Sequence, residues 1–312
     1  MGDVSKPIGL ERSNRPVPKV AVLIVNAHSR KGEALCSAAK QKLEAAGITL
    51  TAAHAVKDPG KLDAIVAGAV RSGAPMVVIG GGDGSLARLV RHVAGTDCVF
   101  AVLPLGTANS FARTLALPLD LDGAVETIAA GQLRRIDLGR IEDHYFVNAA
   151  ALGLSPMIGD TVPHKLKRYL GRFGYLGWAI WCLTRFRPFR LTVEDAKGEH
   201  RTWASEVRIF NGRFHGGVEL IETTDVDSGD LVIQAVTGRS LWRLAFDWYA
   251  KVVRLKSRSA NTIEFRGREL RLRTRPRQKI SIDGECLART PVTIRVAQAA
   301  VDVVVPSAPS MA

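Results

Sequence analysis

The chain has 312 residues, and its 43 Lys+Arg against 30 Asp+Glu give a formal net charge of +13 at pH 7. Its 46% hydrophobic and 23% charged residues are ordinary for globular proteins and exclude a wholly disordered, collagenous or coiled-coil chain. At roughly 100–200 residues per domain, the length predicts two domains. The four cysteines lie far apart without CxxC spacing, which excludes a disulfide scaffold or zinc ribbon and predicts buried, reduced thiols.

Predicted strands and helices alternate through the first part of the chain. Continuous apolar runs predict buried strands at 19–26, 48–55, 76–79 and 98–103. Apolar residues at helical spacing predict helices at 33–46, 61–72, 85–94, 109–116 and 122–130. This alternation is typical of a three-layer, Rossmann-like α/β domain on a parallel sheet, which binds ligands at the carboxyl ends of its strands.

Short strands separated by turn residues follow in the second part. They are predicted at 202–210, 231–236, 262–265, 269–273, 279–282, 292–296 and 301–305. Such a pattern is typical of an antiparallel β-sandwich. We therefore predict an α/β domain over residues 1–139 and a β-sandwich domain over residues 140–312.

The positive charge is concentrated in two stretches of the second part. Residues 161–190 contain seven basic residues and no acid, and residues 251–279 contain eleven basic residues and two acids. Such patches indicate a polyanionic partner: nucleic acid, anionic lipid or a phosphorylated ligand. No nucleic-acid-binding motif is present, so a nucleic-acid partner is not predicted.

Aromatic and apolar residues are interleaved with the first basic stretch. Trp178, Ile180 and Trp181 alternate with arginines such as Arg185, as in a helix that lies at an anionic membrane surface. A core helix with basic ends is the alternative. The apolar run Tyr175–Leu183 is too short to span a bilayer, which needs about 20 residues. We expect a cytoplasmic protein in peripheral contact with the membrane.

Three loops at the expected ligand-binding edge have residues suited to phosphates. Gly80–Ser85 reads GGGDGS, and its consecutive glycines permit close backbone approach and positive φ before a strong helix. It fits neither a P-loop nor a GxGxxG dinucleotide fingerprint. Asp83 would repel a bare phosphate, which suggests a Mg²⁺ ion, or water on one, between them.

The other two loops repeat this logic. In the loop 104–109, Thr107 is suited to bind a phosphate oxygen, and Asn109 is placed to cap the following helix. In the loop 26–32, Ser29 and Lys31 are suitable phosphate ligands, whereas His28 is expected to be a surface or packing residue. For each loop, a tight turn or capped helix without a ligand is the alternative.

Four motifs together resemble one family. NAHSRKG, GGDGS, PLGTANSFAR and IDGE stand in the order of an NPxSGxG-like loop, GGDGT, PxGTGNDxAR and DGE. The chain thus resembles the diacylglycerol kinase catalytic-domain family, most closely its soluble bacterial lipid-kinase branch, which is related to sphingosine and ceramide kinases. The motifs cover nearly the whole chain.

The resemblance implies ATP- and Mg²⁺-dependent transfer of the γ-phosphoryl group to a lipid hydroxyl, between an α/β nucleotide-binding domain and a β-sandwich. Glu285 would be the general base, with Asp283 nearby, and Asp83 would organise the metal or act as a rival base. The residues implied to bind ATP are Asn26, Ser29, Lys31, Gly81, Gly82, Asp83, Gly84, Ser85, Gly106, Thr107 and Asn109.

This sequence departs from the family pattern at four places. Ala27 replaces the usual Pro, Ala108 replaces the second Gly of GTGN, and Val56 stands where a nucleotide-binding Thr is frequent. The family's structural Mg²⁺ turn, typically DDGLL-like, reads DVDSGDL here. The implied metal ligands are Asp225, Ser228 and Asp230, and the matching Asp of the family falls on Ser228. Asp227 is an alternative ligand.

Other functions remain open at this stage. A kinase of a soluble acceptor such as NAD shares the GGDG element and a similar fold. A regulator that binds nucleotide and anionic membranes without kinase activity is a second alternative. The sequence does not encode which lipid is used, and it leaves open whether the chain forms a homodimer.

Overall fold

The computed structural model describes residues 15–28, 32–162, 177–178, 180–212, 214–215, 218–219, 226–238 and 262–307. The chain forms two compact units. The first contains residues 1–138, 212–229 and 297–312, and the second contains residues 139–211 and 230–296. The chain first leaves the first unit next to the predicted boundary at 139/140, but two later segments return to it.

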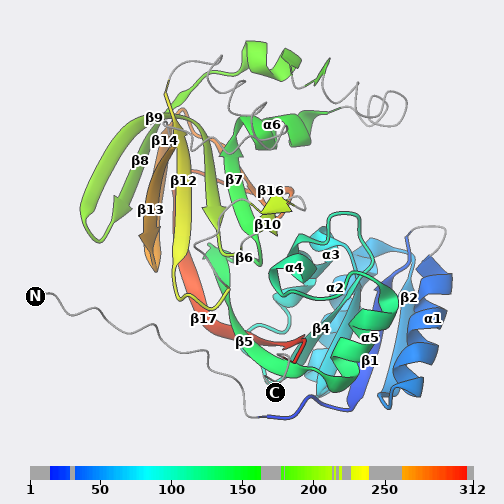
Figure 1. Cartoon of the computed structure of the whole chain (residues 1–312). Helices are drawn as coiled ribbons and strands as arrows, with labels where there is room; N and C mark the ends of the chain where they lie inside the picture. Colours follow the sequence, from blue (N-terminus) through cyan, green and yellow to red (C-terminus); the bar gives the residue numbers. More distant parts are fainter. Residues whose placement is uncertain are drawn as a thin grey trace, which may run out of the picture. The chain divides into compact units, whose positions relative to one another are not determined.

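Parallel strands form the centre of the first unit (Figure 1). They are β1 (Val20–Asn26), β2 (Thr49–Val56), β3 (Met76–Gly81) and β4 (Val99–Pro104), in the order β4-β3-β1-β2. Successive residues such as Leu23 and Ile24 are both fully buried, although their side chains point to opposite faces. The continuous apolar runs of the sequence therefore reflect a sheet that is covered on both sides.

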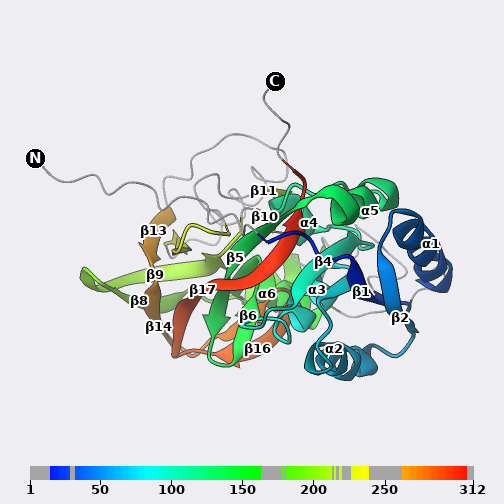
Figure 2. The ribbon, with the colours of Figure 1, turned by 90° about the horizontal axis from the view of Figure 1, so that it is seen from below.

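Helices cover the two faces of these strands. They are α1 (Gly32–Ala45), α2 (Leu62–Arg71), α3 (Asp83–Val90), α4 (Ser110–Thr114) and α5 (Leu121–Ala130), with a 3-10 helix η1 (Pro59–Lys61) before α2. α1 packs against α5, and α2 packs against α3. In Figure 2, α1 and α5 lie on one side of the strands and α2 lies on the other. The predicted three-layer α/β arrangement is confirmed.

The strand β17 (Val292–Val305) contributes to both units. It is continuous, whereas the sequence predicts separate strands at 292–296 and 301–305. The apparent break surrounds Ala299, whose φ is +46°. Beyond it, Val303 pairs in parallel with Phe100 of β4. Because this pairing extends the first unit's sheet, the predicted second domain over 140–312 is corrected at its C-terminal end.

Antiparallel strands build the second unit. They are β7 (Ala149–Gly153), β8 (Phe189–Asp195), β9 (Gly198–Phe210), β12 (Leu231–Thr237), β13 (Thr262–Gly267), β14 (Glu269–Arg275), β15 (Lys279–Ile282) and β16 (Glu285–Arg289). β9 pairs with β7, β8 and β12, and β14 pairs with β8 and the first part of β17. Buried Leu270 and Leu272 alternate with exposed Arg271 and Arg273 along β14. The predicted antiparallel β-sandwich is confirmed.

The remaining elements are short or connect others. They are β5 (Gln132–Ile141), β6 (His144–Phe146), α6 (Leu154–Thr161), the hairpin of β10 (Phe214–His215) and β11 (Val218–Glu219), and helical residues at 177–178 and 180–185. Gly139 of β5 is required by its neighbour, because a Cβ atom there would lie 2.1 Å from Cζ of Phe146. The sequence did not reveal β5 to β8, which are too short or too polar at one end to stand out.

All four cysteines are free, and three are buried. Burial raises the pKa of the Cys98 thiol to about 11. Cys286, by contrast, is exposed on β16, which corrects the expectation that every thiol is buried. Among the residues that the structure describes, no helix has both the length and the apolar character needed to cross a membrane.

One buried carboxylate joins three segments of the first unit. Asp137 of β5 accepts hydrogen bonds from the backbone N–H groups of Gly229 (2.8 Å) and Ala299 (2.7 Å), and its own N–H donates to the carbonyl of Val226 (2.6 Å). This contact holds the left-handed backbone at Ala299 in place. The returning segments of the first unit are thus tied to β5 by charge-assisted hydrogen bonds.

We predict that Asp137→Asn destabilises the protein by about 1–3 kcal/mol, because an amide group offers only one oxygen where two N–H donors converge. Urea denaturation measures this change. Asp143→Asn, at a side chain that is 96% exposed, is the matched control and should leave the midpoint unchanged. Equal midpoints for the two variants would contradict the role of Asp137.

Candidate active site

Two glycines bring the β3–α3 and β4–α4 loops into direct backbone contact. A Cβ atom on Gly106 would lie 2.5 Å from the Gly82 Cα atom and 2.8 Å from Asn109 Oδ1. The Leu105 N–H also donates to the carbonyl of Gly81 (3.0 Å). The φ angle of Gly82 is −95°, and neither it nor Gly106 has positive φ. Close backbone approach explains glycine at both positions, and the positive φ that the GGGDGS loop permits is not observed at Gly82.

The β1–α1 loop joins the same edge of the sheet through polar side chains. Asn26, at the carboxyl end of β1, donates from Nδ2 to Ser85 Oγ (2.9 Å) in the first turn of α3. A Cβ atom on Gly81 would lie 2.9 Å from Cβ of Ser85 and 3.8 Å from Cβ of Asn26. The carboxyl ends of β1, β3 and β4 therefore meet, as the predicted topology requires.

Asp83 links the two glycine loops from the start of α3. Its Oδ1 atom accepts the N–H of Phe111 in the first turn of α4 (2.9 Å). Asn109, which we expected to cap this helix, makes no side-chain cap because its backbone is left-handed (φ +48°, ψ +44°). Its side chain turns back into the loop instead, accepting from Gly106 N–H (2.9 Å) and donating to the Gly106 carbonyl (3.0 Å). The helix cap thus comes from Asp83, 28 residues earlier.

The other predicted nucleotide residues take different positions. Gly84 and Thr107 are exposed at this edge, and nothing lies within 4 Å of a Cβ atom on Gly84. Val56 is buried beside Asn26 in register and offers no polar group. His28 is exposed, as expected, and its N–H donates to Asn26 Oδ1 (3.2 Å). Ser29 and Lys31 lie outside the described residues.

This edge of the sheet has the features of an anion site. α3 begins at Asp83, two residues before the predicted start, and directs its N-terminal N–H groups and the positive end of its dipole toward the loops. Asn26, Ser85 and Thr107 add neutral polar groups around it. Backbone amides, together with amide and hydroxyl side chains next to glycines, can bind the oxygens of a phosphate chain.

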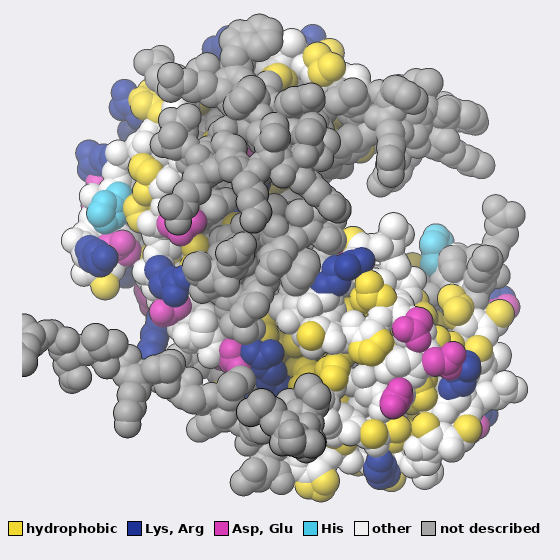
Figure 3. Space-filling view, in the orientation of Figure 1, with side chains coloured by type: hydrophobic (Ala, Val, Ile, Leu, Met, Phe, Trp, Pro, Cys, Tyr) yellow, Lys and Arg dark blue, Asp and Glu magenta, His cyan; other side chains and the backbone are white. Residues whose placement is uncertain are grey.

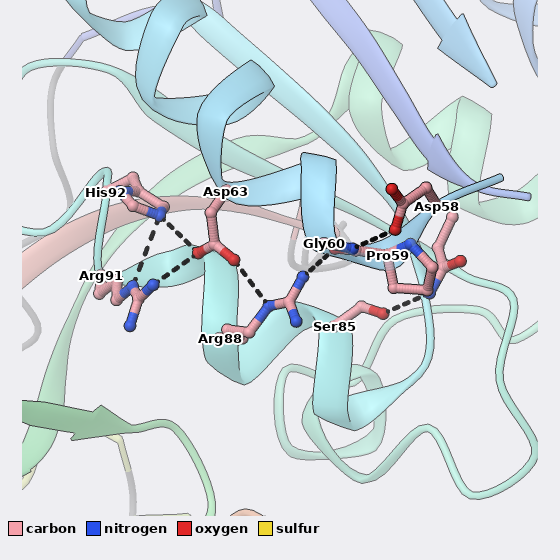
Figure 4. A network of polar contacts seen from close by, with 9 residues as sticks. Asp58, Pro59, Gly60, Asp63, Ser85, Arg88, Arg91 and His92 are labelled. Carbon is pink, nitrogen blue, oxygen red and sulfur yellow. Dashed lines mark hydrogen bonds and ion pairs between the residues drawn. The ribbon is translucent and has the colours of Figure 1, made fainter. Parts of the chain in front are cut away.

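A charged network that the sequence did not reveal supports α3 from behind. Figure 4 shows Arg88, one turn beyond Ser85, between Asp63 of α2 and Pro59 of η1. Arg88 Nε lies 3.0 Å from Asp63 Oδ2, and its Nη2 donates to the carbonyl of Pro59. Arg91 (2.7 Å) and His92 (2.8 Å) contact Asp63 Oδ1. The segment after β2 is thereby fixed to the helix that carries Ser85.

Within this network, the pKa of the Asp63 carboxyl group is shifted. Burial tends to raise the pKa of Asp63, but the hydrogen bond with His92 and the charges of Arg88 and Arg91 outweigh it and lower the pKa below the ordinary value. Acidic and basic residues on two predicted helices are an ordinary surface pattern. Only the packing of α2 on α3 identifies them as partners.

The acidic hairpin belongs to the second unit. Asp283 and Gly284, between β15 and β16, both have positive φ, as in the tight turn that Asp-Gly favours. The Asp283 carboxylate accepts the backbone N–H groups of Val147 (2.9 Å), Asn148 (3.3 Å) and Ala149 (3.2 Å). These contacts give Asp283 a positioning role in the hairpin. Glu285, by contrast, is exposed.

The candidate metal turn is held by an arginine and by Asp137. Arg134 donates from Nε (3.0 Å) and Nη2 (2.7 Å) to Asp227 Oδ2. The carboxylate that we considered as an alternative metal ligand is therefore paired with a guanidinium. Ser228 is exposed and Asp230 is half-buried, while Asp225 lies outside the described residues. Within the described part of the chain, no three His, Cys, Asp or Glu side chains come together as a metal-binding group.

Ser110 is a further departure from the family pattern. The Asp of PxGTGNDxAR falls on Ser110, which is buried at the start of α4 next to Asn109. The signal was present in the motif comparison, where the sequence reads GTANS. The Asp83 carboxylate contacts this helix start through the Phe111 N–H.

Comparisons with known proteins assign both parts of the chain. Residues 20–141 match the family described as the diacylglycerol kinase catalytic domain. Residues 150–305 match the family described as the YegS C-terminal NAD kinase beta sandwich-like domain.

Similar proteins agree with these matches. A protein of Staphylococcus carnosus named as a lipid kinase is 27% identical over 220 residues, which cover 69% of this chain and 72% of the relative. A protein of Salmonella arizonae named probable lipid kinase YegS is 34% identical over 180 residues, which cover 55% of this chain and 59% of the relative. A solved structure described as a diacylglycerol kinase of Bacillus anthracis aligns with a TM-score of 0.78 at 21% identity, over 96% of this chain and 99% of that one. It shares the fold.

We predict that Gly106→Ala lowers the affinity for ATP at least about tenfold, because the new methyl group must separate two backbone segments that are already in contact. Isothermal titration with ATP measures this. Gly68→Ala in α2 is the control: nothing lies within 4 Å of its Cβ position, so it should retain affinity and gain about 0.5–1 kcal/mol of stability. Unchanged affinity in Gly106→Ala would contradict the close-contact argument.

We also predict that Asp63→Asn costs about 1 kcal/mol of stability at pH 7. Because the pKa of Asp63 is lower in the folded chain than in the unfolded chain, its ionised form stabilises the fold above the unfolded value of about 4. That contribution is lost as the pH falls through the folded-state pKa. Denaturation at several pH values should show the two proteins converging in acid, whereas Asp97→Asn, at a side chain that is 95% exposed, should follow the parent throughout. A constant difference down to low pH would refute the assignment.

Proposed function

We infer that this chain, which belongs to the diacylglycerol kinase catalytic-domain family, transfers the γ-phosphoryl group of ATP to a hydroxyl group of a lipid. The observation that carries this proposal is the meeting of three loops at one sheet edge, where Gly82 touches Gly106 and Asn26 bonds Ser85. Such a site suits a chain of phosphates. The names of the relatives support a lipid as the acceptor.

The ATP site that we propose fits the residues present. Gly81, Gly82 and Gly106 leave the space that side chains would fill, and Ser85, Thr107 and Asn26 supply polar groups. We include Gly84, Asp83 and Asn109 as the parts that shape the loops. Phosphoryl transfer depends mainly on positioning and on neutralising charge, so a rigid cradle of this kind is what the reaction needs.

Magnesium enters this proposal with the nucleotide, as Mg·ATP. When bound, it neutralises charge on the β- and γ-phosphates. Asp83 is the carboxylate at the phosphate loops, and its Oδ1 atom is held by the Phe111 N–H, which fixes its direction. Arg134 already neutralises Asp227, so we do not assign that carboxylate to a second, structural ion. We therefore assign no step to such an ion.

Glu285 is the general base in this proposal. It is an exposed carboxylate at the start of β16, directly after a turn that Asp283 ties to residues 147–149. The carboxylate takes the proton of the lipid hydroxyl as the oxygen bonds to the γ-phosphorus, while the bond from that phosphorus to the bridging oxygen of ADP breaks. Asp283 acts through the turn and does not itself exchange a proton.

A kinase of a soluble acceptor is the second candidate. The description of the second family match includes an NAD kinase-like sandwich, and this favours testing NAD directly. The decisive experiment incubates the full chain with [γ-³²P]ATP and Mg²⁺, with either a total lipid extract in mixed micelles or NAD. Label in the lipid phase supports our proposal, label in NAD supports the second candidate, and ATP binding without transfer would leave a regulator.

We predict that Glu285→Gln lowers turnover by about 10²–10⁴-fold while ATP affinity stays within about twofold, because a glutamine keeps the shape but cannot accept the proton. Transfer of ³²P and nucleotide titration measure the two quantities. Glu264→Gln, at another exposed glutamate of the second unit, is the control and should behave like the parent. Turnover at the parental rate in Glu285→Gln would remove the base assignment.

A further inference from the structure

Like charges face each other at one end of the β-sandwich. Arg190 of β8 is the register partner of Arg275 of β14. Both side chains are exposed, as are those of Arg277 and Arg289. Like charges directly opposite each other on a sheet destabilise it, so this arrangement runs against the stability of the isolated protein.

The other end of the same strands is arranged in the opposite way. Arg271 lies 3.5 Å from Glu194 of β8, and Arg273 lies 2.6 Å from Glu199 of β9. Arg295 of β17 lies 2.9 Å from Glu269. Charges on one outward face of β14 are therefore compensated where the strand begins and uncompensated where it ends.

The segments that form this end contain no acidic residue. Asp and Glu are absent from residues 180–193, 273–281 and 287–293. In the described part of the chain, Arg190, Arg275, Arg277 and Arg289 take part in no ion pair, although Arg190 lies over the Trp203 ring (5.4 Å). We call Arg190, Arg275, Arg277 and Arg289 the basic edge.

The two halves of the basic edge are held together by buried hydroxyl groups. The turn after Arg275 is closed by the Gln278 N–H, which donates to the hydroxyl oxygens of Thr274 (3.2 Å) and Thr290 (2.9 Å). These two hydroxyls also bond each other. The turn that carries Arg277 and the strand end that carries Arg289 therefore keep a fixed spacing.

An exposed apolar group precedes the basic edge in the chain. Ile180 is 57% exposed and Trp181 is 41% exposed. The Trp181 ring stacks on the Trp178 ring, with 4.4 Å between the ring centroids. Trp178 donates from Nε1 to the Thr161 hydroxyl (3.1 Å), and the Arg185 guanidinium lies over the Trp181 ring, 4.5 Å from its centroid. We call Ile180, Trp181 and Arg185 the tryptophan wedge. It is an exposed apolar group with a cation over the Trp181 ring.

The wedge is anchored to the strand that begins the basic edge. Cys182 and Phe186, on the inner side of this helical segment, are buried, and Phe186 packs edge-on against Phe189, the first residue of β8. Arg190 follows directly. In Figure 3, dark-blue basic side chains lie beside yellow hydrophobic side chains at the upper left margin of this unit.

We propose that the tryptophan wedge and the basic edge together form a docking surface for an anionic lipid bilayer. Tryptophan and isoleucine enter the headgroup region, while the unpaired cations bind lipid phosphates, which relieve their mutual repulsion. A nucleic acid would match the charge but gives no reason for exposed isoleucine. This inference rests on the proposed lipid kinase function, because a membrane is where such an acceptor resides.

The test measures binding of the full chain to vesicles without ATP or acceptor. Flotation with phosphatidylcholine vesicles that contain phosphatidylglycerol should show binding that weakens with salt and disappears on pure phosphatidylcholine. Arg190→Ala/Arg275→Ala should lower the partition coefficient about 25-fold, at roughly fivefold per cation. Trp181→Ser should lower it about tenfold.

Matched controls separate this surface from general charge and hydrophobicity. Arg271→Ala removes a compensated cation from the same strand face, and Ile263→Ser removes another exposed apolar side chain, which is 42% exposed on β13. Both should bind vesicles as the parent does. The thermal midpoint of Arg190→Ala/Arg275→Ala should be no lower than that of the parent, because a repulsion is removed.

Several results would overturn the proposal: absence of binding to anionic vesicles, an equal loss of binding in test and control variants, or loss of single-stranded oligonucleotide binding in the arginine variant while vesicle binding persists. Activity in detergent micelles should be unchanged in Arg190→Ala/Arg275→Ala. If vesicle binding behaves as expected but no lipid is phosphorylated, the kinase proposal fails and the docking surface stands.

Discussion

The contact between Gly82 and Gly106 sets the geometry on which the candidate active site depends. Two backbone segments that follow different strands touch there without a side chain between them. Because β3 and β4 are adjacent and parallel, their carboxyl ends arrive at this point together. The surrounding polar groups then need only small displacements to face a common ligand, and the N-terminus of α3 adds its dipole.

Three aspartates share a task in this molecule. Asp83, Asp137 and Asp283 each accept backbone N–H groups from a segment that is distant in sequence. A carboxylate in a glycine-rich motif invites a chemical interpretation, yet each of these first determines where a loop lies. Of these three carboxylates, only that of Asp83 lies next to the phosphate loops and has a chemical part in our proposal.

The sequence predicted the parallel strands, most helices and the three loops, because apolar periodicity and glycine placement are local signals. It did not predict the left-handed backbone of Asn109 or the cap that Asp83 supplies to α4, since both depend on contacts across the loop pair. The Asp63 network was invisible for the same reason. β17 was divided into two because Gln298–Ala300 has little strand propensity, whereas the N–H of Ala299 is held by a buried carboxylate.

The path of β17 has a consequence for how the protein is made. Its second part pairs with β4, so the first unit lacks a strand until residues near Val303 have been synthesised. During translation, the edge of β4 stays unpaired while the whole β-sandwich emerges from the ribosome. A fragment that ends near residue 139 would carry that open edge permanently, and the aggregation expected of it would come from missing backbone partners rather than from a poor core.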